Sequence, residues 1–360
     1  MTPEQIAEAM VAIGEPAFRG RQIAHWIYPK HAAAFAEMSD LPAELRTRLA
    51  ESFAVSPVTA VHIESSDDER TEKALFSLGP IAGRLAEGPL AERRARFNTV
   101  EAVYMEYPGR GTVCVSSQAG CAMGCVFCAT GQAGYIRDLE PGEIVGQALH
   151  FARVARERRG PDGRVTNIVF MGQGEPMMNF DRVWGSIELL HRSDCFGLGA
   201  RHITVSTVGI VPGIRRLATM PLPVNLAVSL HAADDALRGS LVPVNRRFPI
   251  GEIMSACRDY IAATRRRVSF EYTCIDGVND RDSDAESLAR LLRGMLCHVN
   301  LIALNPGGSP AFAPSSRERV RSMASVLNAR GVTTTIRDTR GQSISAACGQ
   351  LRARVLADAS

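Results

Sequence analysis

Four of the nine cysteines in this 360-residue chain lie within the fifteen residues from Cys114 to Cys128. Three of them, Cys121, Cys125 and Cys128, follow the spacing Cys-x3-Cys-x2-Cys. Three kinds of structure use cysteines at this density: a disulfide framework, a zinc site and an iron–sulfur cluster. Each kind makes a different demand on the residues around it, so the context of the cluster distinguishes them.

The surroundings of the cysteines favour an iron–sulfur cluster. The chain begins without a basic segment followed by an apolar stretch, and no apolar run approaches the roughly 20 residues of a membrane span. We therefore expect a cytoplasmic protein with reduced thiols, which disfavours a disulfide framework. A structural zinc site needs four ligands, whereas this group offers three thiols and no nearby histidine. Three thiolates on a cubane cluster would leave one iron open to a small molecule; zinc remains the alternative.

The cysteines precede a long series of alternating strand and helix patterns. Apolar, β-branched runs occupy 111–117, 166–172, 202–209, 225–231, 268–275, 298–305 and 332–338, and helical patterns occupy 142–157, 181–192, 211–218, 250–264, 285–295 and 316–329. Repeated βα units predict an α/β fold with a parallel sheet, either open or curved into a full or partial barrel. Both arrangements bind ligands at the carboxyl ends of strands. Four of those ends read GQGEP, STVG, SLHA and NPGG, which makes them the expected active face.

Charge divides the chain at about residue 75. Residues 1–75 read as short helices and hold 7 Lys and Arg against 12 Asp and Glu, although the whole chain has a net charge of +3. Short basic clusters follow, at 93–94, 156–159, 246–247, 265–267 and 337–340. Each cluster alone is typical of a solvated surface, and together they allow a polyanionic partner without requiring one.

Several motifs together resemble a known family. The cysteine triplet with Phe127 before its third cysteine resembles the radical S-adenosylmethionine (SAM) superfamily, as does GQGEP. The segments CVSSQAGC, MGQGEPMMNF, STVGI, SLHA, NLIALNP, DTRGQSISAACGQL and FRGRQIAHWIY, spread over nearly the whole chain, resemble the RlmN family of RNA methyltransferases. The resemblance implies a partial (β/α)6 radical SAM barrel over 107–345. A helical N-terminal domain (1–75), a linker or hairpin with an insertion (76–106) and a C-terminal tail (346–360) would complete the chain.

The resemblance also implies an activity. Members of the family methylate C2 of adenine in 23S rRNA (adenosine 2503) and in tRNA (adenosine 37). This carbon lies between two ring nitrogens and is electron-poor, so it does not attack the methyl group of SAM by ordinary displacement. A [4Fe-4S] cluster, two SAM molecules per turnover and an electron donor such as flavodoxin or ferredoxin are implied, and we expect a monomer.

Two further cysteines acquire roles from the resemblance. Cys348, in AACGQL, would accept a methyl group and carry it to the RNA, and Cys114 would resolve the resulting covalent adduct by forming a disulfide with Cys348. For Cys348 the alternative is an inert thiol packed near the C-terminus. The SAM contacts carry over onto residues at the predicted strand ends: Gly174, Glu175, Ser206, Ser229, Leu230, His231 and Asn305.

Glu101 is the candidate proton acceptor. In VEAVYM it shares a strand face with Val103 and Met105. An unpaired carboxylate on such an apolar face would have a raised pKa, which suits a general base. The alternative is an exposed glutamate on an edge strand.

Two other functions compete with adenine-C2 methylation. A Cfr-like enzyme would methylate C8 of the same adenine with the same cysteines; Pro176 and the DTRG segment (338–341) favour the RlmN family. A non-catalytic, metal-stabilised RNA-binding module would contain zinc and would not consume SAM. Catalysis is favoured because a binding module has no use for Cys114 and Cys348.

Overall fold

The computed structural model describes residues 1–80, 87, 91–305, 310–337 and 351. Ten strands form one sheet in the order β1-β2-β3-β4-β7-β8-β9-β10-β11-β12, and β5 pairs with β6 in a separate hairpin. The strands are β1 (Val58–Ser65), β2 (Thr71–Leu78), β3 (Thr99–Tyr107), β4 (Arg110–Cys114), β5 (Gln118–Gly120), β6 (Tyr135–Asp138), β7 (Asn167–Phe170), β8 (Ile203–Thr207), β9 (Asn225–Ser229), β10 (Val268–Cys274), β11 (Cys297–Ala303) and β12 (Thr334–Ile336).

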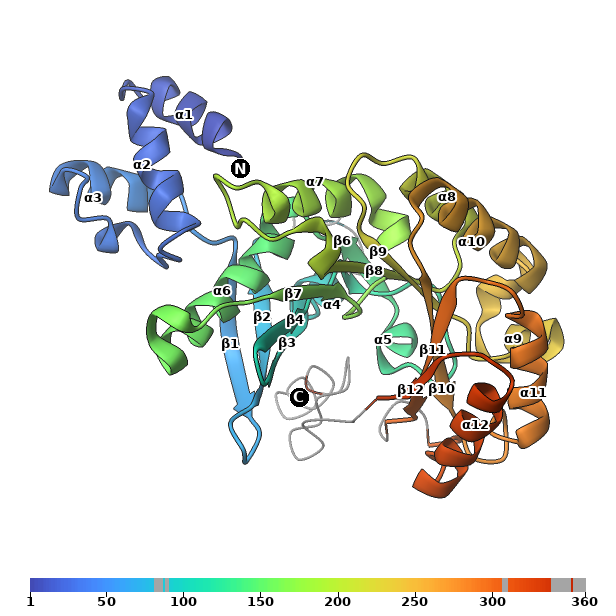
Figure 1. The fold of residues 1–360 in the computed structure, drawn as a ribbon. Coiled ribbons are helices and arrows are strands. Elements are labelled where there is room, and N and C mark those ends of the chain that lie inside the picture. The colour runs from blue at the N-terminus through green and yellow to red at the C-terminus, as the bar shows by residue number, and fades with distance from the viewer. Residues whose placement is uncertain (81–86, 88–90, 306–309, 338–350, 352–360) are drawn as a thin grey trace.

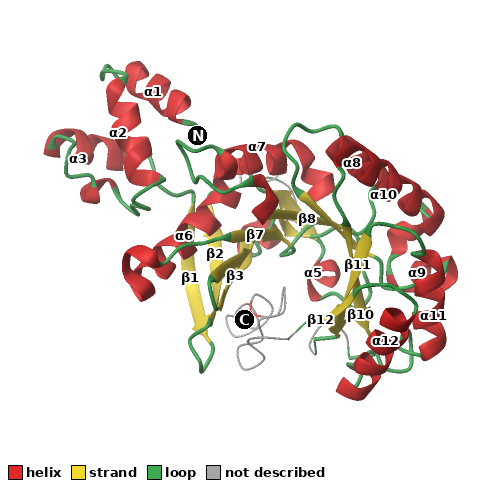
Figure 2. Ribbon diagram, in the orientation of Figure 1, coloured by secondary structure: helices red, strands yellow, loops and turns green. Residues whose placement is uncertain are grey.

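The seven strands from β4 to β12 in the large sheet run parallel, which confirms the predicted α/β fold. Six βα units lead to β12, and the strands curve in an arc (Figure 1). The longer helices lie along the outside of this arc (Figure 2). They are α6 (Pro141–Arg159), α7 (Phe180–His191), α8 (Val211–Ala218), α9 (Asp235–Leu241), α10 (Ile250–Thr264), α11 (Asp282–Leu291) and α12 (Arg317–Ala329). The short helices α4 (Ala91–Arg96) and α5 (Ala129–Ala133) do not belong to this outer layer, and α5 lies inside the arc (Figure 2).

The two faces of the sheet differ in chemistry because strand side chains alternate between them. We call the face that carries Cys114 the inner face. The registers between strands place Thr204, Ser206 and Ser229 on it as well. The opposite face carries residues that are buried and apolar: Ile168, Phe170, Val205, Leu226, Val228, Phe270 and Leu301. This face packs beneath the helices, so the polar inner face is left for ligands.

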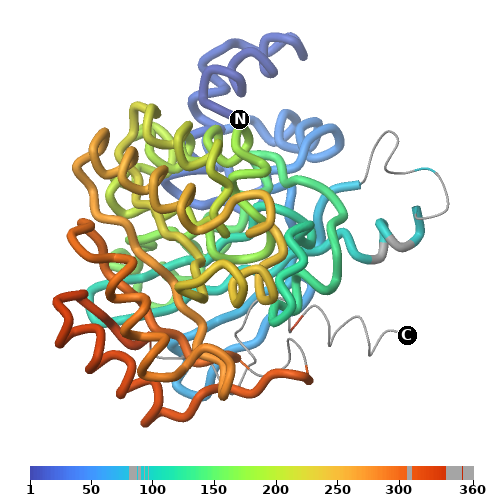
Figure 3. The backbone as a smooth tube through the Cα atoms, turned by 90° about the vertical axis from the view of Figure 1, so that its right-hand side faces the viewer, coloured from blue at the N-terminus to red at the C-terminus, as the bar shows by residue number. Residues whose placement is uncertain are grey.

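The N-terminal region is helical only as far as Ser52. It contains α1 (Pro3–Ala12), α2 (Phe18–Ile27) and α3 (Ala43–Ser52), which project at one end of the molecule (Figure 3). Thr2 caps α1, accepting a hydrogen bond from the backbone of Gln5 at 3.2 Å.

The prediction of a helical domain extending to residue 75 is wrong for residues 58–65 and 71–75. These residues form β1 and the start of β2, an antiparallel hairpin that extends the sheet. Every residue of β2 except Ser77 is buried, so side chains on both faces of this strand are covered. A strand covered in this way does not show the alternation of polar and apolar residues by which a strand is recognised.

Within the described residues, no helix has the length and apolar character that crossing a bilayer requires.

Candidate active site

Cys121, Cys125 and Cys128 lie in one loop between β5 and α5. The backbone N–H of Val126 donates to Leu241 O at 3.1 Å and attaches the loop to the end of α9, while that of Cys128 donates to Cys125 O at 3.1 Å within the loop. Burial raises the pKa of the Cys125 thiol, and the neighbouring Cys128 and Cys121 raise it further. The three thiols are therefore close enough to influence one another's ionisation.

The donor set fits a cluster with one open iron. The loop offers three thiols, one fewer than the four protein ligands with which a structural zinc site encloses its metal. Burial raises the pKa of Cys121 to about 12, so binding iron to this loop would release protons as the thiols become thiolates.

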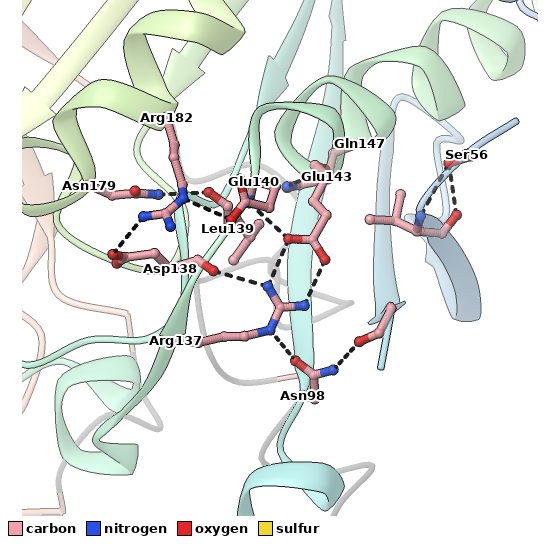
Figure 4. Close-up of polar contacts among 12 residues, drawn as sticks. Ser56, Asn98, Arg137, Asp138, Leu139, Glu140, Glu143, Gln147, Asn179 and Arg182 are labelled. Carbon is pink, nitrogen blue, oxygen red and sulfur yellow. Dashed lines mark hydrogen bonds and ion pairs between the residues drawn. The ribbon is translucent and has the colours of Figure 1, made fainter. Parts of the chain in front are cut away.

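A polar network anchors the hairpin that precedes and follows the cysteine loop (Figure 4). Arg137 on β6 holds both carboxylate oxygens of Glu143 on α6, at 2.7 and 2.8 Å, and donates to Asn98 at 2.9 Å. The amide of Asn179 donates to Ser117 O and Leu139 O, both at 2.9 Å. These contacts attach the hairpin to α6 and to the start of α7, so the loop is held at a fixed place beside the sheet.

The GQGEP segment lies against the entry to the cysteine loop. The Glu175 N–H donates to the Gln118 side chain at 2.9 Å, and the Gln173 N–H donates to Ser116 Oγ at 2.8 Å. Gly174 has a φ of +102°, and a Cβ there would lie 2.6 Å from Cβ of Gln118. Only glycine allows this close approach of backbone to side chain.

Glu175 is a buried carboxylate held by backbone donors. It accepts from Met177 N at 3.0 Å and from Val208 N, at the end of β8, at 2.8 Å. Burial raises the pKa of Glu175 to about 7, although these two hydrogen bonds lower it. Its charge in turn raises the pKa of Cys121 and Cys125, which places the carboxylate near the cysteine loop.

One buried arginine, which the sequence analysis missed, connects the strand ends. Arg238 on α9 donates to Val208 O at 2.5 Å, to Ser229 O at 3.2 Å and to Leu230 O at 3.0 Å. Its guanidinium is fully buried and also donates to Asn245 at 2.7 Å. It therefore holds the ends of β8 and β9 together, where Ser206, Ser229 and Leu230 were predicted to contact SAM. Its place in a helical pattern, DALRGSL, gives no sequence signal of this role.

His231 is a neutral residue in a strained backbone position. Its φ is +62°, its Nδ1 accepts from Thr273 N at 3.1 Å, and its ring meets Phe127 edge-on at 4.9 Å between centroids. Burial lowers the pKa of His231 to about 3, and the charge of Arg238 lowers it further. Phe127, between the second and third cysteines, thus connects the cysteine loop to the end of β9.

Glu101 is buried, as predicted, but it is not unpaired. Its carboxylate is 2% exposed and lies 2.8 Å from the Lys73 ammonium, which is fully buried. β3 lies between β2 and β4, so the alternative of an exposed edge strand is wrong. The β2 pattern TEKALF places a lysine on the same strand face as Leu75. This lysine was the sequence signal that could have predicted the ion pair.

Cys114 is a free thiol at the end of β4, on the same face as Lys73 and Glu101. Burial raises its pKa and the charge of Glu101 adds to this, while Arg337 and Lys73 lower it. Asn305 is the second residue after the end of β11. Cys348 and the DTRG segment lie outside the described residues. The structure thus brings together the cysteine loop, Glu175, the ends of β8 and β9, and the inner face beside Cys114.

These features define the class of protein. An arc of parallel strands with a three-cysteine loop and a glycine-rich second motif is the arrangement of radical SAM enzymes, and residues 115–291 match the family described as the radical SAM superfamily. Residues 1–55 match the family described as ribosomal RNA large subunit methyltransferase N-terminal domain.

Similar proteins narrow the class to one family. The "Probable dual-specificity RNA methyltransferase RlmN" of Chloroflexus aurantiacus is 49% identical over 358 residues, covering 97% of this chain and 91% of the relative. Its counterpart in Moorella thermoacetica is 44% identical and covers 98% and 96%. The crystal structure of a radical SAM methyltransferase from Sphaerobacter thermophilus superposes with a TM-score of 0.88 at 48% identity, covering 97% of both chains. The chain belongs to the RlmN family of radical SAM RNA methyltransferases.

Proposed function

We propose that this enzyme methylates C2 of adenine in both 23S rRNA (adenosine 2503) and tRNA (adenosine 37). The dual-specificity relatives support both substrates. The observation that carries the proposal is the free Cys114 thiol on the inner face beside the Lys73–Glu101 pair. A methyltransferase that worked by simple displacement would have no use for this half-buried thiol.

In this proposal Cys121, Cys125 and Cys128 hold a [4Fe-4S] cluster, and the strand ends hold SAM. The SAM contacts would be Gly174, Glu175, Ser206, Ser229, Leu230, His231 and Asn305. When bound, the reduced cluster supplies the electron that cleaves SAM into methionine and a deoxyadenosyl radical. The electron would come from a donor such as flavodoxin or ferredoxin.

The chain's own residues would direct the methyl group. The Cys348 thiolate takes a methyl group from one SAM molecule by displacement. A deoxyadenosyl radical from a second SAM molecule would then take one hydrogen atom from this methyl group, and the resulting methylene radical would add to adenine C2, so that RNA is covalently attached to Cys348. Glu101 would take the proton from C2, and one electron would leave the adduct for the oxidised cluster. Finally the Cys114 thiolate would attack the Cys348 sulfur: a disulfide forms, the bond from sulfur to the new carbon breaks, and its electron pair leaves with the carbon, which takes up a proton to complete the methyl group of the released RNA.

Two features support Cys114 in the resolving role. Arg337 and Lys73 lower the pKa of its thiol against the effect of burial, so they favour the thiolate that must attack. The thiol also shares the inner face with the proposed base. We further infer that the enzyme acts as a cytoplasmic monomer, since its proposed substrates are rRNA and tRNA.

Nucleoside mass spectrometry tests this function. The reconstituted enzyme should convert adenosine to 2-methyladenosine in both a 23S rRNA fragment and a tRNA. Formation of 8-methyladenosine would instead identify a Cfr-like enzyme. Zinc-loaded protein that binds RNA without consuming SAM would identify a binding module.

A further inference from the structure

Glu271 on β10 has one carboxylate oxygen that no group in the described part of the chain satisfies. The residue is 5% exposed. Asn300 Nδ2 donates to Oε1 at 2.8 Å, but Oε2 is buried and accepts no hydrogen bond. Leaving a buried acceptor of this kind unsatisfied costs free energy, more so if it is charged. A ligand with a hydrogen-bond donor would remove this cost.

The position of Glu271 in the sheet indicates which ligand would bind to it. It pairs in register with Ser229 on β9 and with Asn300 on β11, so its side chain belongs to the inner face. The Leu230 N–H donates to Glu271 O at 3.0 Å, and the Thr273 N–H donates to His231 Nδ1 at 3.1 Å. The backbone of Glu271 is therefore bonded to Leu230, and that of Thr273 to His231, so Glu271 lies beside the Ser229–His231 segment that we assign to SAM.

The electrostatics of the position suit a hydroxyl group. Burial raises the pKa of Glu271, while the Asn300 hydrogen bond and the charge of Arg337 lower it. A hydroxyl donates to a carboxylate and accepts from a carboxylic acid, so it satisfies Oε2 in either state, whereas an amino group satisfies only the ionised state. Acidic side chains near strand ends bind ribose hydroxyls in other α/β proteins.

We propose that Glu271 binds a ribose hydroxyl of SAM. The inference rests on the proposed function, because it requires SAM at the ends of β9 and β10. The target nucleotide in RNA also carries a ribose hydroxyl, so the experiment must separate these two sources. SAM is favoured because Glu271 contacts the segment assigned to SAM, whereas three strands separate β10 from the strand of Cys114 in the order of the sheet.

Equilibrium dialysis of anaerobically reconstituted enzyme tests the proposal. The ligands are SAM and its analogues that lack the 2′- or the 3′-hydroxyl. Wild-type enzyme should bind SAM about 10- to 100-fold more tightly than one of the analogues, the size expected for a hydrogen bond to a charged group. Glu271→Ala should bind SAM more weakly and should lose this preference. Glu271→Gln keeps the size of the side chain and should lose most of the preference while retaining the fold.

Glu72 provides a matched control. Its side chain is also 5% exposed and also has one buried oxygen without a hydrogen-bond partner. It lies on β2 next to Lys73, so it belongs to the opposite face of the sheet. Glu72→Gln should therefore bind SAM and both analogues as the wild type does. Iron content and thermal unfolding should be measured for all the variants.

The possible outcomes distinguish failure of the inference about Glu271 from failure of the proposed function. If both Glu271 variants keep the full preference for SAM over the analogues, the inference is wrong. It is equally wrong if SAM affinity is unchanged and only affinity for RNA with a 2′-hydroxyl at the target nucleotide falls, because Glu271 would then bind the RNA. If wild-type enzyme with its full iron content does not bind SAM, the proposed function itself fails.

Discussion

Replacing Glu175 with glutamine would test two effects of this carboxylate separately. One is its effect on the stability of the fold, and the other is its contribution to SAM binding. The side chain is buried at the end of the GQGEP segment and accepts from Met177 N and Val208 N. Burial raises its pKa from 4.5 to about 7. The folded protein therefore holds a proton on Glu175 at pH values where the unfolded chain has already released it.

The sign of the effect follows from this difference. The stability that a raised carboxyl pKa contributes is fully present below the unfolded pKa of 4.5 and is lost as the pH rises through about 7. The loss amounts to about 3 kcal/mol in total, of which about 2 kcal/mol falls between pH 5 and pH 7.5. Glutamine does not titrate, so Glu175→Gln should gain about 2 kcal/mol on the wild type over this interval.

Urea unfolding of the cluster-free protein at several pH values, followed by circular dichroism, measures this gain. Glu318→Gln is the control, because the pKa of that exposed carboxyl is lowered by its own backbone and by Ser316. The difference between wild type and this control variant should stay nearly constant above pH 5. In reconstituted enzyme, Glu175→Gln should bind SAM at least about 10-fold more weakly. A stability difference independent of pH, or unchanged SAM affinity, would refute the reasoning.

Two further predictions concern the cluster and the buried ion pair. Anaerobically prepared enzyme should contain about four irons per chain, and Cys125→Ala should abolish SAM cleavage; stoichiometric zinc without iron after reconstitution would exclude the cluster. Lys73→Met should destabilise the protein by about 3–5 kcal/mol in denaturant unfolding, because it removes the ion-pair partner of the buried Glu101. The double variant with Glu101→Leu should recover most of this loss, and a loss below about 1 kcal/mol in Lys73→Met would contradict the assignment.

The parallel part of the fold was predictable because its strands have a strong sequence pattern. Each strand from β7 to β11 is a short apolar run followed by small polar residues, and a helical pattern separates it from the next. β1 and β2 were missed for the opposite reason. β2 is covered on both faces and contains Glu72 and Lys73, which are buried and form ion pairs with Arg158 and Glu101. Such compensation between distant residues leaves no periodic signal.

The residues of the candidate site also divide into those that a sequence pattern predicts and those that it does not. Cysteine spacing and strand-end motifs predicted Cys121, Glu175 and Ser229 as site residues because each lies in a loop or at a strand end that the local sequence pattern defines. Arg238 and Glu271 were not located, since their importance arises from register and burial across several strands. A single arginine in a helix, or a single glutamate in a strand, has many structural uses.

The central claim is that two cysteines divide the work of methyl transfer, and one gel measures it directly. Cys114→Ala enzyme, incubated with SAM, an electron donor and substrate RNA, should form a protein–RNA band that survives denaturing electrophoresis. The adduct should accumulate because the thiol that resolves it is missing. The band should be absent from the double variant in which Cys348 is also alanine. If Cys114→Ala turned over normally, or trapped no RNA while still cleaving SAM, the two-cysteine mechanism would be contradicted.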